Sequence, residues 1–86
     1  MQLNNQQPLF MKTKFNIALI GGRGYVGQEI IHILNQHPNF ELCKAFSRTA
    51  ADTEVDGYNQ HPTLKYSLLE DSNLDLDNID IALSLI

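Results

Sequence analysis

The chain has 86 residues, of which 43% are hydrophobic and 19% are charged, and this mix suits a soluble globular domain. Its formal net charge of −4 argues against a general binder of nucleic acid or of acidic membranes. Cys43 is the single cysteine, which excludes an internal disulfide, and no apolar run approaches the roughly 20 residues of a membrane span. We therefore expect a cytoplasmic protein.

The chain begins with a polar stretch that is followed by a short apolar run. Residues 1–13 are rich in Asn and Gln and show no hydrophobic periodicity, which predicts a disordered leader. Residues 14–20, KFNIALI, combine β-branched and aromatic side chains and end at glycines, as expected of a buried strand. We therefore expect the folded part of the chain to begin at residue 14.

Apolar residues at helical spacing follow these glycines. They predict an amphipathic helix from about Tyr25 to Gln36, which Pro38 stops. Residues 40–46, FELCKAF, predict a second strand. A strand, a tight turn, a helix and a strand in this order form the first half of a βαβ unit. The apolar positions of the helix are Val26, Ile30, Ile33 and Leu34, and the polar positions are Gln28, Glu29, His32 and Asn35.

The second half of the chain contains two further candidate strands. Residues 47–62 are polar, with a turn predicted at Asp56-Gly57, and residues 64–70 suit a short strand. Residues 79–86, IDIALSLI, are apolar enough for a parallel strand that is covered on both faces, although the sequence ends there. We therefore expect an α/β fold with a Rossmann-like parallel sheet. Residues 14–86 would be the N-terminal part of a doubly wound domain.

Four glycines between the first strand and the helix allow two readings of one motif. Gly22, Gly24 and Gly27 spell G-x-G-x-x-G, whereas Gly21, Gly24 and Gly27 spell G-x-x-G-x-x-G. In both readings Gly24 lies where backbone would approach a diphosphate, and Gly27 would let the helix pack close to the strand. Such a triplet can be merely a tight turn, but its position between a strand and a helix favours dinucleotide binding. No Lys-Ser or Lys-Thr follows, which excludes a P-loop.

The end of the second predicted strand indicates which dinucleotide is bound. NAD enzymes usually place Asp or Glu about 20 residues after the glycines, whereas this chain has Ser47 and Arg48. A guanidinium can bind a 2′-phosphate and a hydroxyl can donate to it, so this pair favours NADP. The alternative is that Arg48 is a solvated loop residue. No metal site is expected, because His32 and His37 are five residues apart and no further ligand completes a set.

These residues together resemble the N-terminal NADP-binding domain of the N-acetyl-gamma-glutamyl-phosphate reductase family. The resemblance covers residues 14–86 and favours Gly21 as the first glycine of the motif. Gly22 departs from the family pattern, which more usually has alanine there. The related aspartate-semialdehyde dehydrogenases are one alternative, and a non-catalytic dinucleotide-binding module or remnant is another. The matching residues are Gly21, Gly24, Tyr25 and Gly27 in G-x-x-G-Y-x-G, then His37-Pro38, Glu41-Leu42 and Ser47-Arg48.

The resemblance implies an oxidoreductase of arginine biosynthesis that reduces an acyl phosphate to a semialdehyde, with hydride from NADPH. It also implies a homo-oligomer when full length. The family's nucleophilic cysteine and histidine base lie in the substrate domain, so we expect no catalytic residue here and no activity from this chain alone. Cys43 is predicted to be a buried, inert thiol, because no cation or helix N-terminus is evident beside it. The predicted cofactor contacts are Gly21, Gly22, Arg23, Gly24, Tyr25, Val26, Gly27, Ser47 and Arg48; for Tyr25, packing at the helix start is an equal alternative.

Overall fold

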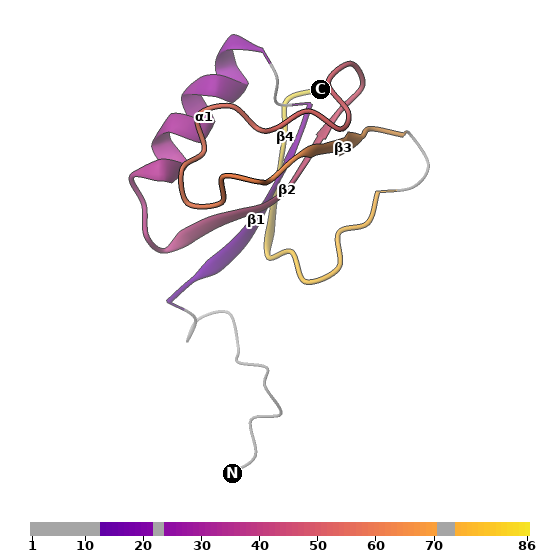
Figure 1. Cartoon of the computed structure of the whole chain (residues 1–86). Helices are drawn as coiled ribbons and strands as arrows, with labels where there is room; N and C mark the ends of the chain where they lie inside the picture. Colours follow the sequence, from indigo (N-terminus) through magenta and orange to yellow (C-terminus); the bar gives the residue numbers. More distant parts are fainter. Residues whose placement is uncertain (1–12, 22–23, 71–73) are drawn as a thin grey trace.

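The computed structural model describes residues 13–21, 24–70 and 74–86. The predicted leader therefore lies outside the described residues except for Thr13. Figure 1 shows the described elements, which are one helix and a four-stranded sheet. No helix that these residues form is long and apolar enough to cross a membrane. In chain order the elements are β1 (Phe15–Ile20), α1 (Tyr25–Asn35), β2 (Phe40–Ser47), β3 (Tyr66–Leu68) and β4 (Ile81–Ser84).

The sheet has the strand order β3-β2-β1-β4, and every neighbouring pair is parallel. The chain moves outward from β1 to β3 and then crosses back, so that β4 lies on the other side of β1. This reversal makes the space beyond the carboxyl ends of β1 and β4 a topological switch point, which is where open α/β sheets bind their ligands. The predicted Rossmann-like parallel sheet is confirmed.

Helix α1 agrees with the prediction in its bounds, but only in part in the face that it buries. The side chains of Val26 and Ile33 are 60% and 50% exposed, although both were assigned to the apolar face. Ile30 is partly buried against the core, as predicted, and the fully buried positions are Gly27, Ile31 and the predicted Leu34. These three lie at spacings of four and three residues, which align them in one row along the helix. Val26 and Ile33 lie outside this row, which accounts for their exposure.

The hydrophobic core has one part on each face of the sheet. Because side chains alternate along a strand, Ile17 and Leu19 of β1 point toward α1, while Ala18 and Ile20 point to the opposite face. The α1 face is the larger part and includes Ile31, Leu34, Leu42, Ala45, Ala50, Val55, Tyr58 and Tyr66. The opposite face includes Phe46 and Leu69 and is partly covered by Leu74 and Ile79. Both faces of β1 are thus buried, as a central parallel strand requires.

Residues 48–65 connect β2 to the parallel strand β3 without a helix, although such crossovers are usually helical. The end of α1 holds this segment. The Asn35 side chain accepts a hydrogen bond from the Asn59 N–H at 2.9 Å and donates one to the Gly57 carbonyl. The predicted turn at Asp56-Gly57 is present, and Gly57 has a φ of +85° that favours glycine. The crossover is thus held by Asn35 of α1 and by backbone hydrogen bonds just before β3, such as that from the Val55 N–H to the Leu64 carbonyl at 2.8 Å.

Strand β2 contains a register shift where it pairs with β1. Ile17 lies opposite Leu42, but the next residue, Ala18, lies opposite Lys44, so Cys43 is the extra residue. Because of the shift, Leu42 and Ala45 share the α1 face although they are three positions apart. The buried Leu42 N–H then donates to the hydroxyl of Tyr58 at 2.8 Å. Tyr58, in the crossover, therefore satisfies a backbone donor within the core.

Candidate functional site

The candidate site lies at the carboxyl ends of the central strands, where Gly21 ends β1. The Gly21 N–H donates to the Phe46 carbonyl at 2.9 Å, and the Leu85 N–H donates to the Ile20 carbonyl at 2.9 Å. These bonds join the ends of β1, β2 and β4. Gly21 has a φ of +78°, and a Cβ atom added to it would lie 2.6 Å from Cγ2 of Ile86. The turn therefore requires glycine at this position.

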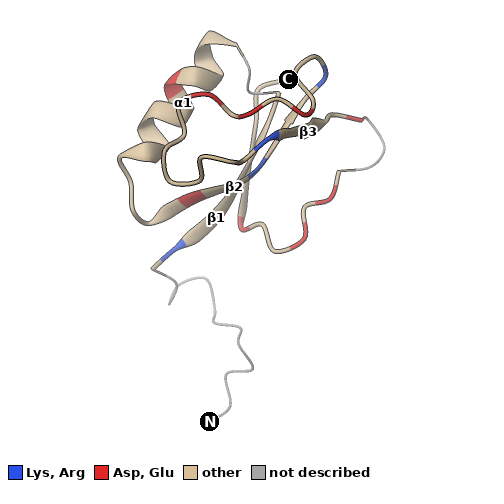
Figure 2. Ribbon diagram, viewed as in Figure 1, with Lys and Arg blue, Asp and Glu red and all other residues tan. Residues whose placement is uncertain are grey.

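Gly24 begins α1 with an open backbone. Its φ of −74° and ψ of −171° are extended, and an added Cβ would meet no atom within 4 Å. The Gln28 N–H donates to the Gly24 carbonyl at 3.0 Å, so the N–H groups of the preceding helical residues have no acceptor within the helix. No side chain caps this end, and the first turn carries no acidic residue (Figure 2). The helix N-terminus can therefore accept an anion.

The remaining described residues of the glycine motif differ in their surroundings. Gly27 is buried, in the same row of α1 as Ile31 and Leu34. Tyr25 is 74% exposed and Val26 is also exposed, so neither side chain packs against the core. Of the two alternatives for Tyr25, packing at the helix start is therefore not observed. Gly22 and Arg23, also predicted to contact the cofactor, lie outside the described residues.

Ser47 and Arg48 lie at the carboxyl end of β2, which is beside the end of β1. They share this edge of the sheet with the glycine turn. The Ser47 side chain is buried, and its Oγ accepts hydrogen bonds from the backbone N–H groups of Thr49 and Ala50. Arg48 is exposed. The positively charged Arg48 and the open N-terminus of α1 thus lie at the same edge of the sheet.

Cys43 lies elsewhere, along β2, and differs in part from the prediction. It is half-buried rather than buried, because the register shift turns it out of the regular alternation. Burial raises the pKa of its thiol, and Glu41 raises this pKa further through a contact of 3.5 Å between Sγ and Oε2. Lys14 lies 3.0 Å from Glu41 and, as its main partner, lowers the pKa of that carboxyl. Both effects favour the protonated form of the Cys43 thiol at neutral pH, and the thiolate is the nucleophilic form.

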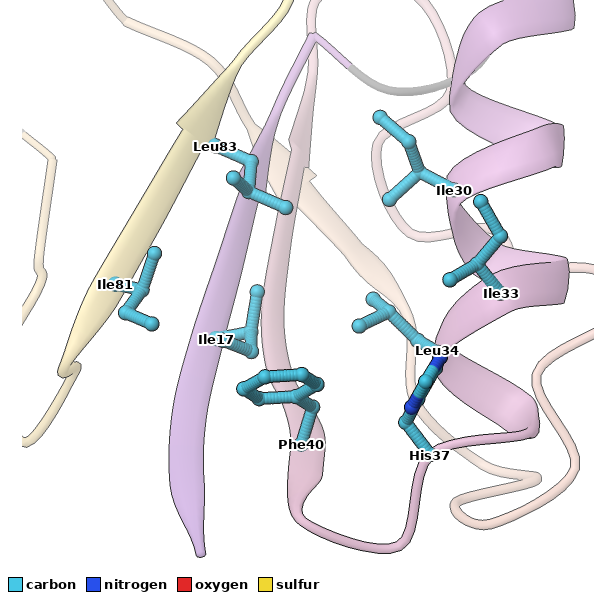
Figure 3. Close-up of a pocket in the computed structure, with 8 residues that line it drawn as sticks. All are labelled: Ile17, Ile30, Ile33, Leu34, His37, Phe40, Ile81 and Leu83. Carbon is cyan, nitrogen blue, oxygen red and sulfur yellow. The ribbon is translucent and has the colours of Figure 1, made fainter.

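An apolar groove lies between α1 and β4, on the helix-covered face of the sheet (Figure 3). Its chemistry differs from that of the glycine turn, because aliphatic and aromatic side chains line it and offer no charged partner to a diphosphate. Ile30 and Ile33 point into it from the helix, across from Ile81 and Leu83 of β4. Ile17, Leu34, His37 and Phe40 complete its lining. The groove is thus not the candidate dinucleotide site.

A family model described as semialdehyde dehydrogenase, NAD binding domain, matches residues 16–85. The chain belongs to this family. The match includes α1, the glycine turn, Ser47-Arg48 and all four strands except Phe15 at the start of β1. The family description therefore assigns NAD(P) binding to the domain whose switch point the structure displays.

Curated relatives agree with this assignment. The chain is 36% identical to Protein arg-6, mitochondrial, of Neurospora crassa, over 84% of this chain and 8% of that protein. It is 34% identical to a LysW-L-2-aminoadipate/LysW-L-glutamate phosphate reductase of Haloarcula marismortui, over 78% of this chain and 19% of that protein. It is 34% identical to N-acetyl-gamma-glutamyl-phosphate reductase of Methanococcus maripaludis, over 81% of this chain and 20% of that enzyme. The chain thus spans a fifth or less of each relative. No solved structure matches it.

Two residues at the site were not singled out from the sequence. Leu85 and Ile86 follow β4 and lie against the end of β1, where Ile86 faces Gly21. Their position follows from the strand order, because a chain that crosses back places β4 beside β1. The apolar run at residues 79–86 signalled a strand but carried no information about its neighbour.

Proposed function

We propose that this chain is the NADP-binding portion of an N-acetyl-gamma-glutamyl-phosphate reductase of arginine biosynthesis. The full enzyme would reduce an acyl phosphate to a semialdehyde. The observation that carries the proposal is the open helix end at Gly24, which stands at a topological switch point beside the end of β2. The resemblance in sequence and the named relatives support the choice of enzyme.

The described residues fit a dinucleotide in size and in charge. Gly24 leaves the space in which a diphosphate would approach the backbone, and a side chain there would reduce it. The N–H groups of the first turn of α1 would donate to the diphosphate, and the helix dipole favours its negative charge. Gly21 shapes the turn that aims the helix at this point. NADPH, when bound, supplies the hydride.

Arg48 would select NADP over NAD. A 2′-phosphate adds about two negative charges, and a guanidinium can bind it through two parallel hydrogen bonds. The carboxylate that holds the ribose hydroxyls in NAD enzymes is replaced at the end of β2 by Ser47 and Arg48. Because Arg48 is exposed at the edge of the sheet, it can reach a ligand that lies across the carboxyl ends of the strands.

A titration of the chain with NADPH and NADH tests the cofactor assignment. Arg48→Ala is expected to weaken NADPH binding by about 1.5 to 3 kcal/mol, the value of a lost charge-assisted contact, and to leave NADH binding nearly unchanged. Lys65→Ala is the matched control, because it removes one positive charge from the exposed crossover. An equal loss for both cofactors in Arg48→Ala would contradict the NADP assignment, and saturable binding of neither cofactor would contradict the proposed function.

A LysW-bound aminoadipyl phosphate is the second candidate substrate, since the name of the Haloarcula marismortui relative includes LysW-L-2-aminoadipate. Disruption of the encoding gene separates the two substrates. Growth that stops without arginine and resumes when arginine is added would support the N-acetyl-gamma-glutamyl phosphate. A requirement for lysine would support the aminoadipyl phosphate and would reject the first assignment.

We also propose that the protein is cytoplasmic and that the full-length enzyme is a homo-oligomer. The single, protonated Cys43 thiol suits a reducing compartment. Localisation of a tagged chain by cell fractionation tests the first part. Recovery in the mitochondrial fraction, as the name of the Neurospora crassa relative would imply for that protein, would overturn it.

A further inference from the structure

The chain leaves the sheet for two residues directly after β2 and then returns to the core. Ser47 is 4% exposed and Ala50 is 3% exposed, whereas Arg48 and Thr49 between them are exposed. Arg48 is therefore carried on a short projection whose two ends are both buried. The position of its guanidinium depends on how firmly those two ends are held.

The Ser47 hydroxyl oxygen holds the base of this projection. It accepts hydrogen bonds from the Thr49 N–H at 3.2 Å and from the Ala50 N–H at 3.0 Å. The Ser47 carbonyl also accepts a hydrogen bond from the Leu69 N–H, at 3.0 Å, so Ser47 is fixed to the residue that directly follows β3. Thr53 fixes the other end, because its hydroxyl donates to the Ala50 carbonyl at 2.6 Å.

We propose that Ser47 is a positioning residue for Arg48 and that it confers NADP selectivity by accepting these two backbone hydrogen bonds. The inference rests on the proposed function, in which Arg48 contacts the 2′-phosphate. It differs from the prediction that Ser47 acts by contacting the cofactor, because the acceptor side of the hydroxyl is directed at the chain's own backbone. Ser47 therefore acts before the cofactor arrives, by ordering the loop.

The physical reason is preorganisation. A loop held in its binding conformation loses less conformational entropy when a ligand binds, and affinity rises accordingly. Without the Ser47 oxygen, the N–H groups of Thr49 and Ala50 lose their acceptor and the projection samples more conformations. Arg48 then spends less time where a 2′-phosphate can meet it. NADH lacks this phosphate, so its affinity depends little on the projection.

The first measurement uses the chain without cofactor. Amide hydrogen exchange at Thr49 and Ala50 is compared between the wild type and Ser47→Ala. Ser67→Ala is the matched control, because it makes the same substitution at an exposed serine of β3. We expect faster exchange at both amides in Ser47→Ala and no change in the control. Unchanged exchange in Ser47→Ala would overturn the proposal without any reference to the cofactor.

The second measurement is the ratio of the NADPH and NADH dissociation constants. Ser47→Ala is expected to raise the constant for NADPH about three- to tenfold and that for NADH less than about twofold. Ser47→Thr retains the hydroxyl and should restore both the ratio and the slow exchange. If the added methyl group disrupts the fold by circular dichroism, Ser47→Asn replaces it, since the Asn oxygen can accept the same N–H groups.

The outcomes separate this inference from the proposed function. If Arg48→Ala lowers NADPH affinity while Ser47→Ala leaves the ratio unchanged, the positioning role is rejected and the proposed function stands. If Arg48→Ala also leaves NADPH binding unchanged, the NADP assignment itself is rejected. Faster loop exchange together with a lower preference for NADPH, both reversed by the hydroxyl-bearing variant, supports the inference.

Discussion

Tyr58→Phe removes one oxygen atom from the core and tests the account of the shifted strand. The Tyr58 hydroxyl accepts a hydrogen bond from the Leu42 N–H at 2.8 Å, and both residues are buried. Phe preserves the ring and its packing, so the variant leaves a buried N–H group without an acceptor. Such a group costs about 1 to 3 kcal/mol. We therefore expect the free energy of unfolding to fall by about that amount.

Urea denaturation followed by circular dichroism measures this change, provided that the slope of the transition is unchanged. The matched control is Tyr25→Phe, which makes the same substitution at a side chain that is 74% exposed. The control is expected to change stability by less than about 0.5 kcal/mol. Equal effects of the two substitutions would refute the reasoning, because they would show that the buried hydrogen bond to Leu42 contributes nothing specific.

The same hydroxyl makes stability depend on alkaline pH. Burial raises the pKa of Tyr58 in the folded chain, whereas an unfolded tyrosine titrates near about pH 10. Because the folded pKa is the higher one, this contribution is fully present below the unfolded pKa. It is lost as the pH rises from there through the folded pKa. Tyr58→Phe should therefore lose less stability than the wild type between neutral pH and about pH 11.

Three further predictions concern the glycine turn and Cys43. Gly21→Ala should destabilise the chain by about 1 to 2 kcal/mol, because Gly21 has a positive φ. Adding Ile86→Ala should restore little of this stability, because Ile86 is 74% exposed and can rotate away from the new methyl group. A large restoration in urea denaturation would show that the side-chain clash dominates. Gly24→Ala should lower the free energy of unfolding by less than about 1 kcal/mol in the same assay, yet weaken the binding of NADPH and NADH about tenfold or more. Unchanged binding would show that the diphosphate lies elsewhere. Glu41→Gln should lower the pKa of the Cys43 thiol and speed its alkylation by iodoacetamide at about pH 8 by a factor of about two to five. An alkylation rate equal to that of the wild type would show that burial alone holds the thiol protonated.

Local sequence patterns were sufficient to predict the helix, the strands and the glycine turn. The bounds of α1 follow from Gly24 before it and from Pro38 shortly after it, and the helix lies within one residue of its predicted end. All four described strands lie within predicted apolar runs, extended by one residue at Ser47. The family resemblance was confirmed as well, because the family model matches residues 16–85. Each of these features depends on neighbouring residues, so sequence patterns record them.

Features that join distant segments were not predicted. The sequence assigned Val26 and Ile33 to the buried side of α1, but the fully buried row is the one through Gly27, Ile31 and Leu34. It also gave no sign of the register shift at Cys43, which exposes that residue in part. Both outcomes depend on the position of one element against another, which hydrophobic periodicity does not contain.

The sequence by itself determined the order of the elements, the glycine turn and the Ser47-Arg48 pair. Only the tertiary structure decided that β4 pairs with β1, so that Ile86 faces Gly21 at the switch point. Only the tertiary structure showed that the buried Ser47 oxygen binds the loop backbone. The physical reason is that a hydrogen bond or a strand pair needs two partners at a fixed distance, and the core sets that distance by packing both sides of the sheet at once.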